Sequence, residues 1–226
     1  MNTETIVCKQ IKKSFQAGDK TIEVLHSIDL IAHEKEMIML MGPSGSGKTT
    51  LISIIGGLLN ADSGECTVLG ENINQLPEEV KTTFRGMNVG FLFQHLMLIP
   101  TLTALENAVI PLLCLGKNRK ESLEKAAHFL EKVGLGDKLQ KKPSQLSGGE
   151  QQRVALVRSF VHGPKIILCD EPTSFLDLER GKKIMDILKD AEETNATIIV
   201  VTHDPRILDY ADRIVRIEDG MIVHGS

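Results

Sequence analysis

One glycine-rich stretch carries the clearest chemistry in this sequence. Residues 42–49 read GPSGSGKT, a full match to the pattern GxxxxGK[ST], and they stand between an apolar run and a helical pattern. The glycines allow successive backbone N–H groups to converge on phosphate oxygens, and the start of the helix adds its positive end. We expect Lys48 to reach the β- and γ-phosphates of a nucleotide and the Thr49 hydroxyl to ligate Mg²⁺. The residues expected around the nucleotide are Gly42, Pro43, Ser44, Gly45, Ser46, Gly47, Lys48, Thr49 and Thr50.

Two carboxylates follow the apolar run 166–169. Asp170 and Glu171 come at the end of what we interpret as a buried strand, where ligands of open α/β sheets bind. Asp170 is suited to hold Mg²⁺ through its waters, whereas Glu171 points elsewhere and can polarise a water for attack on the γ-phosphate. Alone, such an acidic pair is as often a solvated loop. The phosphate loop upstream favours the catalytic interpretation.

A third segment, LSGGEQ at residues 146–151, begins a helical pattern. Ser147 and Glu150 have the spacing of a capping box, which gives the segment a purely structural interpretation. The same helix start, with Gly148 and Gly149, also presents a hydroxyl and free backbone N–H groups to an anion. Because the chain already has a complete phosphate loop, this second surface is most simply explained as serving the nucleotide of another copy.

The rest of the sequence predicts an α/β frame that positions these segments. Short apolar runs broken by turn residues before Met41 indicate a β-rich entry region. Continuous apolar runs at 37–41, 166–169 and 198–201 indicate buried strands of a mostly parallel sheet. Between residues 103 and 162 the apolar residues recur at helical spacing, so we expect a helical subdomain inserted into the frame.

Composition excludes several classes of protein. The 226 residues carry 26 basic and 30 acidic side chains, a net charge of −4, which argues against a general grip on nucleic acid or anionic lipid. The apolar runs have the length of strands rather than the roughly 20 residues that span a bilayer, and the first residues lack signal-peptide features, so we expect a cytoplasmic protein. The cysteines, Cys8, Cys66, Cys114 and Cys169, form no CxxC pair and are interpreted as small buried or half-buried residues.

Five segments in this order closely resemble the ATP-binding subunits of ABC transporters: GPSGSGKTT, LSGGEQQR, ILCDEPT, SFLD and VTHD. The resemblance covers essentially the whole chain. It implies an α/β P-loop NTPase fold with a RecA-like core, an N-terminal antiparallel β subdomain and an inserted α-helical subdomain. A single domain over 1–226 would then divide into a core with its β subdomain, 1–94 and 160–226, and a helical signature subdomain, 95–159. Two such subunits would close head to tail on two ATP molecules.

The resemblance also assigns roles to single positions. Phe15 matches the aromatic that stacks on adenine, and Gln94 matches a residue that senses the γ-phosphate and ligates Mg²⁺. Asp177 matches the D-loop aspartate that links the two sites, and His203 matches the switch histidine at the γ-phosphate. The residues that would complete the partner's ATP site are Ser147, Gly148, Gly149, Glu150 and Gln151.

Three positions depart from the family pattern. Lys35 precedes Glu36 where glycine is common, Cys169 lies inside the acidic-strand motif, and Phe175 stands in the D-loop where a smaller residue is usual. None of them removes a catalytic group, but Phe175 could alter communication between the two sites.

The stretches 55–58, 89–94 and 98–107 resemble one branch of the family, the lipoprotein-release and macrolide-export ATPases. That resemblance implies an ATP-bound homodimer that drives a separate transmembrane permease from the cytoplasmic face of a bacterial inner membrane. The cargo would be a lipoprotein, lipid, peptide or drug-like compound.

Three other functions are open to a chain of this kind. A signalling ATPase of the cell-division type, whose membrane partner transports nothing, would carry the same motifs. A DNA-repair or chromosome-maintenance ATPase is disfavoured because the interval 94–146 is too short for long coiled coils and no basic stripe is present. A kinase would need a second substrate pocket in place of the signature and switch motifs.

Overall fold

The chain begins with an antiparallel sheet. The computed structural model describes residues 3–174, 176–192 and 195–223. Strands β1 (Glu4–Ala17) and β2 (Lys20–His33) form a long hairpin, and β4 (Ser63–Val68) and β5 (Glu71–Asn72) complete the strand order β2-β1-β4-β5. On β2 the alternate residues 28, 30 and 32 are buried, the period of a strand with one face on a core.

A second sheet of six strands forms the centre of the molecule, in the order β10-β9-β3-β8-β7-β6. Its strands are β3 (Met37–Met41), β6 (Val89–Leu92), β7 (Ile166–Asp170), β8 (Thr197–Val201), β9 (Arg213–Glu218) and β10 (Met221–Val223). Every pairing is parallel except that of β10 with β9. Leu40 on β3 and Asp170 on β7 both pair with Val201 on β8, so these three strands end together at one edge. The predicted mostly parallel sheet is confirmed.

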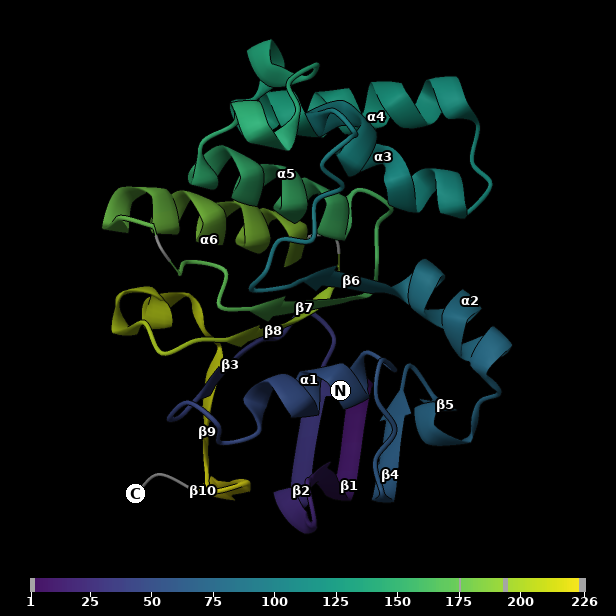
Figure 1. Cartoon of the computed structure of the whole chain (residues 1–226), viewed down its shortest axis with the longest axis vertical. Helices are drawn as coiled ribbons and strands as arrows, with labels where there is room; N and C mark the ends of the chain where they lie inside the picture. Colours follow the sequence, from purple (N-terminus) through teal and green to yellow (C-terminus); the bar gives the residue numbers. More distant parts are fainter. Residues whose placement is uncertain (1–2, 175, 193–194, 224–226) are drawn as a thin grey trace.

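Helices cover both faces of this sheet (Figure 1). They are α1 (Lys48–Ile55), α2 (Glu78–Asn88), α3 (Ala104–Cys114), α4 (Arg119–Lys132), α5 (Gly148–Phe160) and α6 (Leu178–Glu192), with short 3₁₀ turns η1 (Ile73–Gln75), η2 (Gly136–Lys138), η3 (Pro143–Gln145) and η4 (Pro205–Tyr210). In Figure 1, α3 to α6 lie above the six-stranded sheet, and the antiparallel sheet lies below it beside α1. Helix α1, which follows the phosphate loop, and helix α5, which begins in the signature segment, therefore lie on opposite faces of the six-stranded sheet.

The core follows the two-residue period of the strands. Met37 and Met39 point into the cluster shared with α3 to α6, whereas Ile38 and Leu40 point into the cluster shared with α1 and the antiparallel sheet. All four side chains have no exposed surface, so the alternating methionines of β3 are core residues.

The cysteine prediction is wrong at one position. Cys8, Cys66 and Cys169 are buried, but Cys114 at the end of α3 is exposed. Its helix turns that position away from the core, which the spacing of the apolar residues did not reveal.

Within the described ranges, we find no helix both long and apolar enough to cross a bilayer.

Candidate functional site

The phosphate loop leaves β3 through glycines that leave little room for a side chain at two positions. A Cβ on Gly42 would lie 1.9 Å from the Ile217 carbonyl oxygen of β9. A Cβ on Gly47, which has a left-handed φ of 96°, would lie 2.5 Å from Leu25 of β2. The loop thus passes close to both β9 and β2 before it reaches α1. Backbone N–H groups at such a helix start can bind an anion.

Lys48 lies folded into this loop. Its Nζ donates to the carbonyl oxygens of Gly42 at 2.9 Å and Pro43 at 2.7 Å, and to the Ser46 hydroxyl at 3.2 Å. Burial lowers the pKa of the Lys48 ammonium, and the nearby carboxylates of Glu171 and Asp170 oppose that shift. Both carboxylates therefore act on the Lys48 ammonium through their charge.

Thr49 and Asp170 form the oxygen pair expected of a magnesium site. Thr49 Oγ1 donates to Asp170 Oδ2 at 3.0 Å, although the two residues are 121 positions apart. Burial raises the pKa of Asp170; the Thr49 hydrogen bond and the charge of Lys48 act the other way, while Glu171 adds to the rise. A hydroxyl and a carboxylate side by side are the hard oxygen donors that Mg²⁺ prefers, so these residues fit the ion.

Glu171 is held against the neighbouring strand and a histidine. Its N–H donates to the Val201 carbonyl at 2.9 Å, and its backbone has a left-handed φ of 53°. Its Oε1 lies 2.7 Å from Nδ1 of His203, the residue that follows β8 by two positions. The chain turns at Glu171 in a conformation that is uncommon for a non-glycine residue, and in it the Glu171 carboxylate contacts His203.

Gln94 connects the two halves of the predicted site. It lines a cavity of about 410 Å³ together with Glu171, Ser174 and His203. It also lines a second cavity, of about 370 Å³, whose wall includes Ser147, Gly148 and Gly149. The exposed Gln94 side chain therefore stands between the acidic strand end and the signature helix.

The signature helix α5 begins with the predicted capping box. Ser147 Oγ accepts from the Glu150 N–H at 3.3 Å, and Glu150 Oε2 accepts from the Ser147 N–H at 2.7 Å, which lowers the pKa of Glu150. Gln151 donates to the Pro143 carbonyl at 3.0 Å. Ser147 and Gly148 are nonetheless exposed, so the helix start faces outward.

Phe15 and Asp177 lie apart from these cavities. Phe15 is 40% exposed on β1, opposite Ile22, with the Lys13 ammonium 5.6 Å from its ring centre. Asp177 is exposed and accepts from the Arg180 N–H at 2.9 Å, which caps the first turn of α6. Phe175 lies outside the described residues.

The sequence reasoning missed residues that support the site from behind. Gln152 of α5 donates to the Pro172 carbonyl, which ties the signature helix to the turn after Glu171. Thr173 and Asp204 are buried and hydrogen-bonded at 3.3 Å. The only signal was their position beside predicted site residues.

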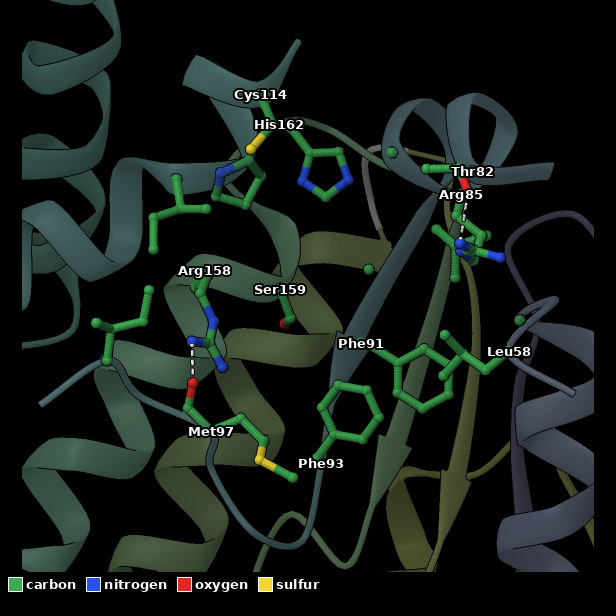
Figure 2. Close-up of a pocket in the computed structure, with 17 residues that line it drawn as sticks. Leu58, Thr82, Arg85, Phe91, Phe93, Met97, Cys114, Arg158, Ser159 and His162 are labelled. Atoms are coloured by element: carbon green, nitrogen blue, oxygen red, sulfur yellow. Dashed lines mark hydrogen bonds between the residues drawn. The ribbon is translucent and has the colours of Figure 1, made fainter. Parts of the chain in front are cut away.

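A groove of about 510 Å³, lined among others by Phe93, the residue before Gln94, opens between α2, β6, α3 and α5 (Figure 2). Its apolar lining includes the rings of Phe91 and Phe93, stacked 4.5 Å apart, and Met97, which is 63% exposed. Arg158 donates to the carbonyls of Leu96 and Met97 and so holds the groove's rim to α5. The groove is an apolar depression next to the predicted ATP site.

Comparison with known proteins gives consistent relatives. The family model described as ABC transporter matches residues 25–174. An uncharacterised ABC transporter ATP-binding protein, YknY of Bacillus subtilis, is 43% identical over 98% of this chain and 96% of its own length. The macrolide export ATP-binding/permease protein MacB of Psychrobacter cryohalolentis is 42% identical over 95% of this chain, which spans about a third (32%) of that protein. A dimeric structure of the cassette MJ0796, in a post-hydrolysis state bound to ADP and Pi, is 39% identical with a TM-score of 0.91 over 97% of both chains.

Proposed function

The chain belongs to the ABC transporter family, as an ATP-binding and hydrolysing domain of the P-loop fold, and from this premise we propose that two copies share two ATP molecules and drive a membrane permease. The observation that carries the proposal is the outward-facing start of α5, where Ser147 and Gly148 are exposed. The dimeric state of the MJ0796 cassette supports the same arrangement. Closure would place this helix start on the γ-phosphate held by Lys48 of the other copy.

We propose the following roles for the individual residues, which their geometry supports. Glu171 accepts a proton from the attacking water while His203, 2.7 Å from its carboxylate, orients it and contacts the γ-phosphate. Lys48 exchanges its bonds within the loop for bonds to phosphate oxygens. Thr49, Gln94 and Asp170 would hold Mg²⁺, with Asp170 acting through a water, and the ion supplies positive charge beside the transferred phosphoryl group.

The remaining predicted site residues would surround the nucleotide. Phe15, half-exposed on β1, would stack its ring on adenine, and the backbone N–H groups of residues 42–50 would bind the phosphates. On the partner's nucleotide, residues 147–151 would complete the site, with Asp177 linking the two sites across the dimer. Each role is a proposal to be tested by substitution.

We propose that the groove beside Gln94 receives the permease. Its apolar lining suits a short helix of a membrane protein, and its place next to Gln94 lets such a helix respond to ATP. YknY, matched over nearly its whole length, is named as an ATP-binding protein alone, whereas MacB is named as an ATP-binding/permease protein. These names support a permease on a separate chain, with this protein on the cytoplasmic face of the membrane.

Export is the favoured direction of transport, with a lipoprotein, lipid, peptide or drug-like cargo. Its support is the similarity to macrolide export proteins, 41–43% identical in four of them. A signalling ATPase would use the same dimer cycle, so the membrane partner distinguishes the two functions.

Capture of that partner tests the proposal. Membranes of the source cells, solubilised in detergent, should yield a multispanning protein on the tagged chain, identified by mass spectrometry. The Met97→Glu variant should lose it because a charge in the apolar groove is costly. Met87→Glu, at a residue of α2 that is 56% exposed, is the matched control and should retain it. Equal capture by both variants, or no membrane protein at all, would contradict the assignment.

A further inference from the structure

The segment after β8 touches the segment after β7 at three successive points. The first is the contact of His203 with Glu171 already described, at 2.7 Å. The second joins Asp204 to Thr173 at 3.3 Å, and the third joins Arg206 to the Leu176 carbonyl at 3.5 Å. The segment after β8 therefore contacts the segment after β7 at Glu171, at Thr173 and at Leu176, the residue before Asp177.

Asp204 is the centre of this hydrogen-bond network. Its Oδ1 accepts from the N–H of Arg206 at 3.0 Å and from Nε at 2.8 Å, and its Oδ2 accepts from Nη2 at 2.7 Å and from the Thr173 hydroxyl. Asp204 is 9% exposed, so the pair is shielded on the carboxylate side. The bidentate grip fixes the direction of the Arg206 guanidinium, which lies at the first turn of η4.

Arg206 extends the network to the D-loop. Its Nη2 is shared between Asp204 and the Leu176 carbonyl, and the charge of Asp177 lies near enough to act on the guanidinium. The turns on the other segment are themselves tight: Ser174 donates to the Glu171 carbonyl at 2.9 Å, and the Leu176 N–H donates to the Thr173 carbonyl at 3.1 Å. A short chain of bonded groups thereby connects the His203 segment to residue 176, beside Asp177.

We infer that Arg206, held by Asp204, is a positioning residue that couples the His203 segment to the D-loop and so joins events at one ATP to the second site. The inference rests on the proposed function, because coupling requires two sites in a dimer. Arg206 touches neither phosphate nor water in this account; it acts through Leu176 and Asp177. Its loss should therefore lower turnover and cooperativity while ATP binding is kept.

The test is ATP hydrolysis by the full chain as a function of ATP concentration. Arg206→Ala should lower kcat about tenfold, leave KM within about twofold and reduce the Hill coefficient toward 1. Arg206→Lys should behave like the alanine variant, because a lysine keeps the charge but cannot make the bidentate grip. Arg119→Ala, at an exposed arginine of α4, is the matched control and should match the wild type in all three quantities.

A second variant guards against misfolding. Thr173→Val keeps the shape of a buried side chain but removes the bond to Asp204, so it should reduce the Hill coefficient even if Arg206→Ala does not fold. The inference is overturned if folded Arg206→Ala and Thr173→Val keep the wild-type kcat and Hill coefficient, or if only their KM changes. A wild-type chain without ATPase activity would instead overturn the proposed function.

Discussion

The two anion-binding ends of this chain differ in what surrounds them. At the phosphate loop, Lys48 is 8% exposed and has three hydrogen bonds within the chain, and Thr49 is bonded to Asp170. At the start of α5, the Ser147 hydroxyl and the Glu150 carboxylate bond, among the described residues, only to each other's backbone N–H, and Gly148, the first of the two glycines between them, is exposed. Both ends follow the same principle of a helix start rich in N–H groups.

The difference separates a site that one chain nearly completes from a surface that it leaves open. Strands β3, β7 and β8 bring the phosphate loop, Asp170 and Glu171 to a single edge of the sheet. The α5 start lies on the opposite face of the sheet from α1, and under the proposed function it serves the nucleotide of another copy. Substitutions on the two sides should therefore fail in different ways.

The largest effect is expected at the catalytic carboxylate. Glu171→Gln keeps the shape of the side chain but cannot accept a proton, so ATP hydrolysis should fall about 10²- to 10⁴-fold while ATP still binds. With hydrolysis blocked, ATP-bound dimers should accumulate. Steady-state phosphate release and light scattering after size exclusion measure the two effects.

Glu179→Gln is the control for this substitution. Glu179 lies in the first turn of α6 with its side chain 85% exposed, and its loss should leave hydrolysis unchanged. A monomeric Glu171→Gln variant that hydrolyses ATP at the wild-type rate would refute the catalytic role of Glu171 and with it the contrast between the two ends.

The next effect concerns Lys48. Lys48→Ala removes a charged donor from the phosphates and should weaken ATP binding about 10- to 100-fold, as expected for hydrogen bonds to a charged group. Unlike Glu171→Gln, it should prevent dimers from forming in ATP. The affinity is measured by titration with a fluorescent ATP analogue. Lys120→Ala, at an exposed lysine of α4, is the control and should bind ATP normally in that titration. Unchanged affinity in Lys48→Ala would contradict the phosphate contact.

The sequence predicted the site residues unevenly, for physical reasons. The phosphate loop needs glycine where strands approach its backbone closely, as at Gly42 and Gly47. It can therefore be recognised from the residue types of a short stretch of sequence. The parallel sheet was predictable because continuous apolar runs mark strands buried on both faces. The order of β3, β8 and β7 was not, since neighbours in a sheet are chosen by tertiary packing.

The contacts that depend on that order were out of reach. Glu171 and His203 are 32 residues apart and meet because β7 and β8 are adjacent. Asp204 and Arg206 resemble an ordinary turn at the start of a 3₁₀ helix, and only the approach of Thr173 gives them a role. The exposure of Cys114 likewise depends on which face of α3 meets α5.

A smaller effect separates capping from phosphate binding at the open end. Ser147 and Thr103 both cap helices with complete capping boxes, on α5 and α3. Alanine at either position should cost about 1 kcal/mol of stability in chemical denaturation. Only Ser147→Ala should also lower ATP turnover, about tenfold, because it alone loses a bond to the partner's phosphate. Equal turnover in the two variants would reduce the signature to a helix cap.

The last effect is on stability alone and concerns the ion pair behind the catalytic edge. Hydrogen bonds from Arg206 lower the pKa of Asp204 from 3.8 to about 2, although burial opposes the shift. A carboxylate with a depressed folded pKa stabilises the fold above its unfolded pKa, and that stabilisation is lost as the pH falls from about 4 toward 2. Asp204→Asn should therefore cost about 1 to 2 kcal/mol at pH 7 and almost nothing at pH 2, measured by denaturation across that range. The start of α5 has a carboxylate of its own, Glu150, whose pKa is also lowered. Glu150→Gln is therefore the matched variant with which to compare how stability changes at low pH. If Asp204→Asn loses the same stability at every pH, the hydrogen bonds of Asp204 rather than its charge hold the segment after β8 in place. Ionic pairing would then contribute no more to the stability of the catalytic edge than to that of the α5 start.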